Sequence, residues 1–156
     1  MYEASSAVRK ILDDAHIHSY CKTSGKKGLH IFIPLNGRYE TEVSSNFAKL
    51  IASLTYAQLP NITSLERSPN MRRGKVYIDF LQNRKGQTVA APYSLRSTPD
   101  ATVSTPLEWD EVTSSLDPKK FTIITVSQRI KKIGDIWSQI LTEKNDLKKA
   151  LEYLKG

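Results

Sequence analysis

The chain has 156 residues, of which 39% are hydrophobic and 25% charged, and 23 Lys and Arg against 16 Asp and Glu give it a net charge of +7. This length and composition predict one globular domain over residues 1–156 and exclude a disordered tail. A single cysteine, short apolar runs and polar first residues exclude an internal disulfide, a cysteine-rich zinc site, a membrane-spanning helix and a secretory signal, so we expect a cytoplasmic protein with no membrane partner.

Hydrophobic spacing predicts the elements in chain order. Helical spacing covers residues 3–15, 40–57, 127–141 and 143–154. Strand patterns cover residues 19–22, 29–34, 75–80 and 88–91, residues 93–107 have the composition of a loop, and residues 123–126 fit either a strand or a helix start. Together these predict an α+β fold, with a mixed or antiparallel sheet flanked by helices.

The turn between the first two predicted strands has the composition of an anion site. Gly25 and Gly28 free the backbone to present N–H groups, Ser24 adds a hydroxyl and Lys27 adds a mobile charge. The spacing is not that of a Walker A loop. His30 lies on the strand that follows, where the alternation of side chains predicts that it leaves the face on which the strand's apolar residues are buried. A hairpin turn with a surface histidine explains the same pattern.

Asp79 is the second candidate, because it lies in the apolar run 76–80. A carboxylate on a strand is costly to bury unless it is paired or binds a metal, although a solvated strand face would also accept it. Gln82 and Arg84 follow in a polar, basic stretch. Further positive charge is scattered on both sides of this strand, at Arg67, Arg72, Arg73, Lys75, Lys85 and Arg96. If these side chains converge they form a phosphate-binding surface; separately they are solvated charges.

Four ordered motifs resemble the primase–polymerase domain of bacterial DNA ligase D, in the archaeo-eukaryotic primase superfamily. They are residues 23–35 (TSGKKGLHIFIPL), 76–84 (VYIDFLQNR), 91–96 (APYSLR) and 106–111 (PLEWDE). The resemblance implies a primase-like (RRM-like) core and a nucleotidyltransferase of non-homologous end joining, which adds NTPs or dNTPs to DNA ends with Mn²⁺ or Mg²⁺.

The resemblance also implies roles for particular residues. Ser24, Lys27 and His30 match the motif that holds the incoming triphosphate, and Asp79 matches a metal-binding carboxylate. His30 and Asp79 are therefore the predicted catalytic residues. Gln82 and Arg96 match positions that contact the nucleotide and its phosphates. Arg72 falls at a position that docks the DNA end, and Arg84 is added as a second DNA-binding candidate.

One departure from the family limits these implications. The family's first motif is an Asp-x-Asp pair on an upstream strand, and this sequence contains no Asp-x-Asp. We therefore expect the chain to be the C-terminal part of such a domain, inactive alone, and to associate with itself or with a chain carrying the N-terminal half or a ligase domain. A non-catalytic nucleic-acid or nucleotide-binding module is the alternative.

Overall fold

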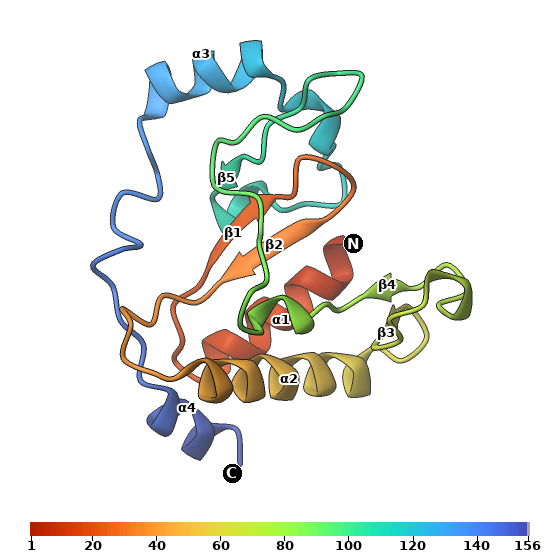
Figure 1. Cartoon of the computed structure of the whole chain (residues 1–156), viewed down its shortest axis with the longest axis vertical. Coiled ribbons are helices and arrows are strands. Elements are labelled where there is room, and N and C mark those ends of the chain that lie inside the picture. The colour runs from red at the N-terminus through yellow and green to blue at the C-terminus, as the bar shows by residue number, and fades with distance from the viewer. Residues whose placement is uncertain (156) are drawn as a thin grey trace.

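The structure, a computed structural model, describes residues 1–155 and is built around two small sheets (Figure 1). β1 (Tyr20–Thr23) is the central strand of the larger one, which has the order β2-β1-β5 with β2 (Leu29–Phe32) and β5 (Pro106–Leu107) both antiparallel to it. The second sheet pairs β3 (Thr63–Ser64) with β4 (Val76–Tyr77) in parallel. It lies at the far end of α2, away from the main sheet.

Helices cover one face of the main sheet. They are α1 (Tyr2–Asp14), α2 (Thr41–Gln58) and α4 (Leu147–Tyr153), while α3 (Ile123–Ile133) lies apart from them beyond β5 (Figure 1). Short 3₁₀ helices span Pro69–Met71 (η1), Leu81–Asn83 (η2), Trp109–Glu111 (η3) and Pro118–Lys120 (η4). The main core lies between α1, α2 and α4 and contains Val8, Ile11, Leu12, Ala15, Ile17, Phe47, Ile51, Leu147 and Ala150.

The alternation predicted for β2 is confirmed. Ile31 packs against the helical core, whereas His30 pairs with Lys22 and so points to the opposite face of the sheet. Aromatic rings continue this second face, because Phe32 and Trp137 meet edge to face with ring centroids 5.2 Å apart. The sheet therefore has one face for the core and one face that carries polar chemistry.

The α+β class is confirmed, and most predicted elements are present with shifted ends. The predicted strand at 75–80 shortens to Val76–Tyr77, so Asp79 follows the strand instead of lying inside it. Residues 88–91 form no strand, and β5 occurs inside the predicted loop 93–107. The predicted helix 127–141 begins earlier and stops at Ile133, because Gly134 adopts a φ of 74° that ends it. No helix of residues 1–155 has the length and apolar character needed to cross a membrane.

A single buried amide joins the start of β1 to the end of the chain. The Asn145 side-chain oxygen accepts a hydrogen bond from the backbone N–H of His18 at 2.8 Å. Its amide nitrogen donates to the carbonyls of His18 and Pro34, both at 3.0 Å. Asn145 is 7% exposed, so these backbone groups have little access to water as a substitute partner. The contact fixes α4 against the ends of β1 and β2.

Asn145→Ala should therefore lower the free energy of unfolding by roughly 1 to 3 kcal/mol, because it leaves the partly buried His18 N–H and carbonyl without their partner. Lys144→Ala, at the exposed neighbouring position, serves as the control and should change stability by less than about 0.5 kcal/mol. Urea denaturation followed by circular dichroism measures both. Equal stability of the two variants would contradict the role given to the amide.

Candidate functional site

The β1–β2 turn (residues 24–28) is closed by its own serine. The Ser24 hydroxyl oxygen accepts hydrogen bonds from the backbone N–H groups of Lys26 at 3.2 Å and Gly28 at 3.1 Å. The Ser24 N–H donates to the Gly28 carbonyl at 2.8 Å. The hydroxyl hydrogen is then left to donate outward, and the Lys27 side chain is exposed at the tip of the turn. The turn therefore offers a hydroxyl donor and an ammonium on one short loop.

Arg96 joins this turn from a distant part of the sequence. Gly25 has a φ of 70°, and a Cβ added there would overlap the Cγ of Arg96. The Gly25 carbonyl accepts a hydrogen bond from the Thr102 hydroxyl at 2.5 Å, and the Arg96 N–H donates to the Thr102 carbonyl at 2.8 Å. Gly25 thus serves two purposes, a left-handed backbone and the space that the arginine stem occupies.

Behind the turn lies a buried lysine that faces His30. Lys22 is 0% exposed, and its Nζ lies 3.0 Å from His30 Nδ1. The same ammonium donates to the Ser104 hydroxyl oxygen at 2.5 Å, and Ser104 donates in turn to the Thr23 carbonyl at 2.7 Å. Lys22 is held from both sides, by β2 and by the segment that leads into β5.

The pKa values of this cluster follow from burial and positive charge. Burial, and then the Arg96 guanidinium, lower the pKa of Lys22 to about 8 from 10.5. Burial, then Lys22 and Arg96, lower the pKa of His30 to about 4, while Asp79 acts in the opposite direction. For Lys22 the shift corresponds to roughly 3 kcal/mol against the charged form. The fold therefore carries an ammonium and a neutral imidazole side by side at neutral pH.

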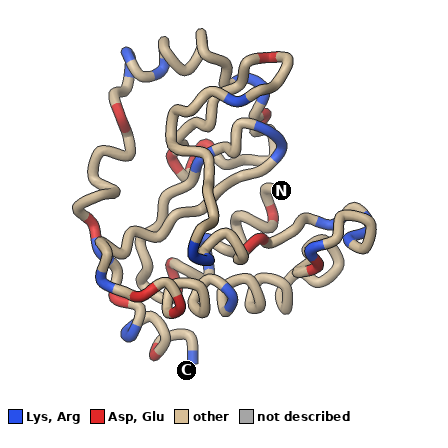
Figure 2. Tube along the Cα trace, in the orientation of Figure 1, with Lys and Arg blue, Asp and Glu red and all other residues tan. Residues whose placement is uncertain are grey.

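No carboxylate neutralises the two central cations. Among residues 1–155 the ion pairs within 4.0 Å involve Arg9, Lys10, His18 and Arg129, and neither Lys22 nor Arg96. The β1–β2 turn itself adds Lys26 and Lys27, and Figure 2 shows basic residues at this turn. An uncompensated cluster of this kind has a positive potential that favours an anionic ligand.

Asp79 and Gln82 lie beside this cluster, just after β4. The Asp79 carboxylate accepts a hydrogen bond from the Leu81 N–H at 3.0 Å and lies 3.4 Å from the Gln82 amide nitrogen. Its side chain is exposed, so the predicted position inside a strand is wrong, and the carboxylate needs no buried partner. Among the described residues no group of three or more His, Cys, Asp or Glu side chains could hold a metal ion. Asp79 is a single ligand and does not form a metal centre by itself.

The two candidate DNA contacts lie at separate places. The Arg72 guanidinium stacks on the Tyr77 ring, 4.0 Å from its centroid, and donates to the Glu66 carbonyl at 2.8 Å. The pKa of Tyr77 is raised first by burial and then by Asp79, through the carboxylate's charge and a hydrogen bond to it. Arg72 is therefore connected to Asp79 through Tyr77.

Arg84 instead lines a hollow of about 260 Å³ against α2, with Ser45, Asn46, Lys49 and Phe80. The structure therefore does not bring it together with Arg72.

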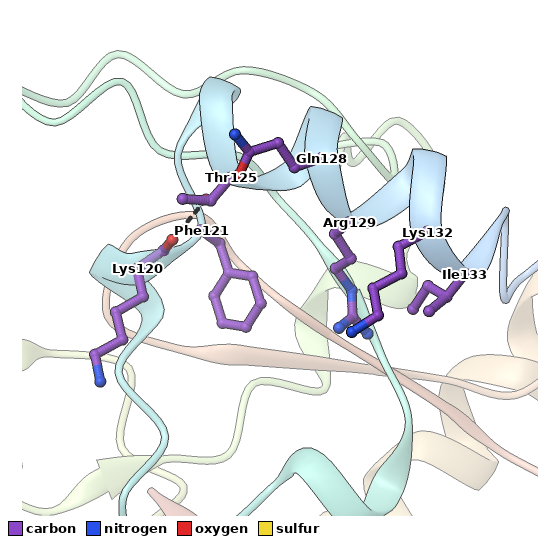
Figure 3. A pocket seen from close by; sticks show the side chains of 7 residues that line it. All are labelled: Lys120, Phe121, Thr125, Gln128, Arg129, Lys132 and Ile133. Atoms are coloured by element: carbon purple, nitrogen blue, oxygen red, sulfur yellow. Dashed lines mark hydrogen bonds between the residues drawn. The ribbon is translucent and has the colours of Figure 1, made fainter.

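A larger hollow of about 400 Å³ lies under α3 (Figure 3). Lys120, Arg129 and Lys132 contribute positive charge to it. Arg129 is already committed to Glu111, with two nitrogen–oxygen distances of 2.6 and 2.5 Å. The hollow contains none of the predicted site residues.

Lys22 and Ser104 are the site residues that the motif analysis missed. The signal for Lys22 was the length of the turn: a five-residue connection that pairs Thr23 with Leu29 places Lys22 opposite His30. Ser104 gave no local signal, because its contact with Lys22 spans 82 positions in sequence.

Comparison with known proteins gives a consistent result. Residues 1–137 match the family model of the LigD primase-polymerase domain. The chain is 42% identical over 133 residues to the bifunctional non-homologous end joining protein LigD of Bacillus subtilis, covering 85% of this chain and 22% of that protein. It is 32% identical over 136 residues to the multifunctional non-homologous end joining protein LigD of Mycolicibacterium smegmatis, covering 86% of this chain and 18% of that protein.

A solved structure, the polymerase domain from Mycobacterium tuberculosis ligase D in complex with DNA, superposes with a TM-score of 0.84 at 30% identity. The match covers 92% of this chain and 50% of that one. The chain thus spans about half of that polymerase domain and about a fifth of the two full-length relatives.

Gly25→Ala should displace Arg96 and destabilise the chain by at least about 1 kcal/mol more than Gly37→Ala does. Gly37 is the matched control, because its φ of 63° imposes the same backbone strain while its Cβ would meet nothing within 4 Å. Thermal unfolding compares the two variants. If both lose the same stability, the close approach of Arg96 to Gly25 is not a constraint on the fold.

Proposed function

The chain belongs to the LigD primase-polymerase family, and from that premise we propose that it forms the triphosphate-binding side of a nucleotidyl-transfer site acting on DNA ends in non-homologous end joining. The observation that carries the proposal is the uncompensated positive cluster of Lys22 and Arg96 around His30, directly behind the β1–β2 turn. A triphosphate is the anion whose several charges and oxygens match such a cluster of donors.

Each donor has a place in this proposal. The outward-facing Ser24 hydroxyl and the mobile Lys27 ammonium reach the triphosphate from the turn, and Arg96 supplies charge from its flank. Gln82 contacts the nucleotide from the neighbouring side. Arg72 and Arg84 contact DNA phosphates, which need only positive charge at the surface and no shared pocket.

Metal binding requires more than the described residues provide. Two-metal phosphoryl transfer needs several carboxylates to hold the ions, and Asp79 supplies one. We therefore assign Asp79 a share of a Mn²⁺ or Mg²⁺ site whose remaining carboxylates, the family's Asp-x-Asp pair, lie on another polypeptide segment. In this proposal residues 1–156 are one part of a polymerase domain, and transfer to a DNA end does not proceed on this chain alone.

The edge of the main sheet supports the same division. β2 ends the order β2-β1-β5, so its outer backbone groups have no partner strand within the described residues. A segment carrying the other half of the domain would cover this edge beside His30. That partner agrees with a chain that spans half of the matched polymerase domain.

A non-catalytic nucleotide- or nucleic-acid-binding module is the second candidate, and the single carboxylate favours it. The two candidates differ in what Asp79 does. In a polymerase half, Asp79 contributes to metal-dependent nucleotide binding; in a binding module, Asp79 is dispensable while Lys27 and Arg96 are required.

Isothermal titration with ATP, with and without Mn²⁺, tests the binding site. Lys27→Ala and Arg96→Ala should each weaken ATP binding about tenfold, because each removes a charge-assisted contact to phosphate. Lys26→Ala, at the exposed neighbour in the same turn, is the control and should bind as the wild type does.

Asp79→Ala should reduce only the gain in affinity that Mn²⁺ gives. Unchanged binding by Arg96→Ala would overturn the proposal, and a Mn²⁺ effect that survives Asp79→Ala would favour the binding module.

Nucleotide addition and sizing chromatography test the division of the domain. The chain alone, with Mn²⁺, ATP and a DNA end, should add no nucleotides. Mixing it with a separately prepared Asp-x-Asp half of a related polymerase domain should give a larger species and restore addition. Addition by the chain alone would refute the division, and so would a sharp monomer that ignores the added half. A dimer of the chain alone would show that the chain associates with itself, the other association expected from its sequence.

A further inference from the structure

Lys22 and His30 form a contact whose direction is fixed by chemistry. Lys22 Nζ lies 3.0 Å from His30 Nδ1 across the β1–β2 pair, in the register that sets these two residues opposite each other. An ammonium has three hydrogens to donate and no lone pair to accept with. His30 Nδ1 must therefore be the acceptor, and the proton of the neutral ring must be on Nε2.

The surroundings keep both partners in these forms. Lys22 is fully buried, and Ser104 accepts a second hydrogen bond from it at 2.5 Å, so the ammonium cannot rotate away from the ring. The charged groups that act on His30 are Lys22 on β1, Arg96 beside the turn and Asp79 after β4. Burial, and then the two cations, lower the pKa of His30 to about 4, which leaves the ring neutral at pH 7.

We propose that Lys22 is a positioning residue that holds His30 in the Nε2–H tautomer, so that the imidazole presents a fixed hydrogen-bond donor to the bound anion. This use of the donor rests on the proposed triphosphate site. With Nδ1 occupied by Lys22 and Nε2 already protonated, His30 has no free lone pair and cannot act as a base. The ring stays neutral, and its Nε2–H stays a donor, at the pH values at which an ordinary histidine gains or loses its charge.

Burial of Lys22 is more than a packing requirement in this view. An apolar side chain of similar length would fill the same volume and would avoid the cost of an unpaired buried charge. What a methionine cannot do is donate a hydrogen bond to Nδ1. The ammonium therefore acts through the histidine, and its loss should change the ring's protonation and not only the stability of the chain.

Long-range ¹H–¹⁵N NMR of the full chain labelled at its three histidines tests the tautomer. His30→Gln identifies the His30 signals by their absence. The wild type at pH 7 should show a bare Nδ1 and a protonated Nε2 for His30. Lys22→Met should show a mixture of tautomers and a His30 pKa higher by about one unit or more. Lys26→Met, which removes an exposed lysine from the same turn, should leave the His30 signals unchanged.

A proton on Nδ1 in the wild type would overturn the proposal, and so would a Lys22→Met spectrum identical to the wild type. The wild-type spectrum decides the tautomer even if Lys22→Met does not fold.

ATP titration separates this inference from the proposed function. Lys22→Met should weaken ATP binding about tenfold, because it removes the charged donor that also orients His30. If the wild type binds no ATP, the proposed function fails while the tautomer result stands. If ATP binds and the tautomer is wrong, only the positioning role fails.

Discussion

The site depends on how β1 is enclosed between β2 and residues 102–105. Thr23 lies opposite Leu29 of β2 on one side and donates its backbone N–H on the other side to the Thr105 carbonyl at 2.8 Å. Its hydroxyl adds a donor to Val103 O at 3.1 Å and an acceptor for Thr105 N–H at 2.9 Å. These contacts place Ser104 against Lys22 and bring Arg96 against Gly25. Lys22 and Arg96, the two central cations of the proposed phosphate site, are thus positioned by contacts around one four-residue strand.

The same arrangement explains a cost in stability. A buried lysine without a carboxylate is destabilising, and a neighbouring arginine makes it more so. Arg129, a cation that is also only partly exposed, is by contrast paired with Glu111. A buried ammonium without a carboxylate, beside a histidine kept neutral by burial and by two cations, is typical of a site for an anion and not of a packing solution. The exposed Asp79 is by contrast a single carboxylate that forms no metal centre with the other described residues.

The sequence predicted what depends on local pattern. The spacing of Val8, Ile11 and Leu12 indicated α1, and the alternation around His30 indicated its outward face, because both follow from the geometry of one element. The motifs identified the family through residues 23–35 and 76–84, and that assignment is confirmed. Short strands escaped prediction: β5 has two residues, and only its pairing with Cys21 and Lys22 defines it. Ser104 and the burial of Lys22 depend on contacts across some 80 residues of chain, which no local pattern encodes.

The separation between Thr23 and Ser104 has a consequence for how the chain folds. The hairpin of β1 and β2 can form from neighbouring residues, but Lys22 gains its oxygen acceptor only when a loop of about 80 residues closes. Contacts that distant in sequence form slowly and together with the rest of the tertiary structure. A chain still emerging from the ribosome therefore has the serine–glycine turn without the anchored ammonium behind it. The proposed phosphate site should therefore be completed late in folding, after the β1–β2 hairpin has formed.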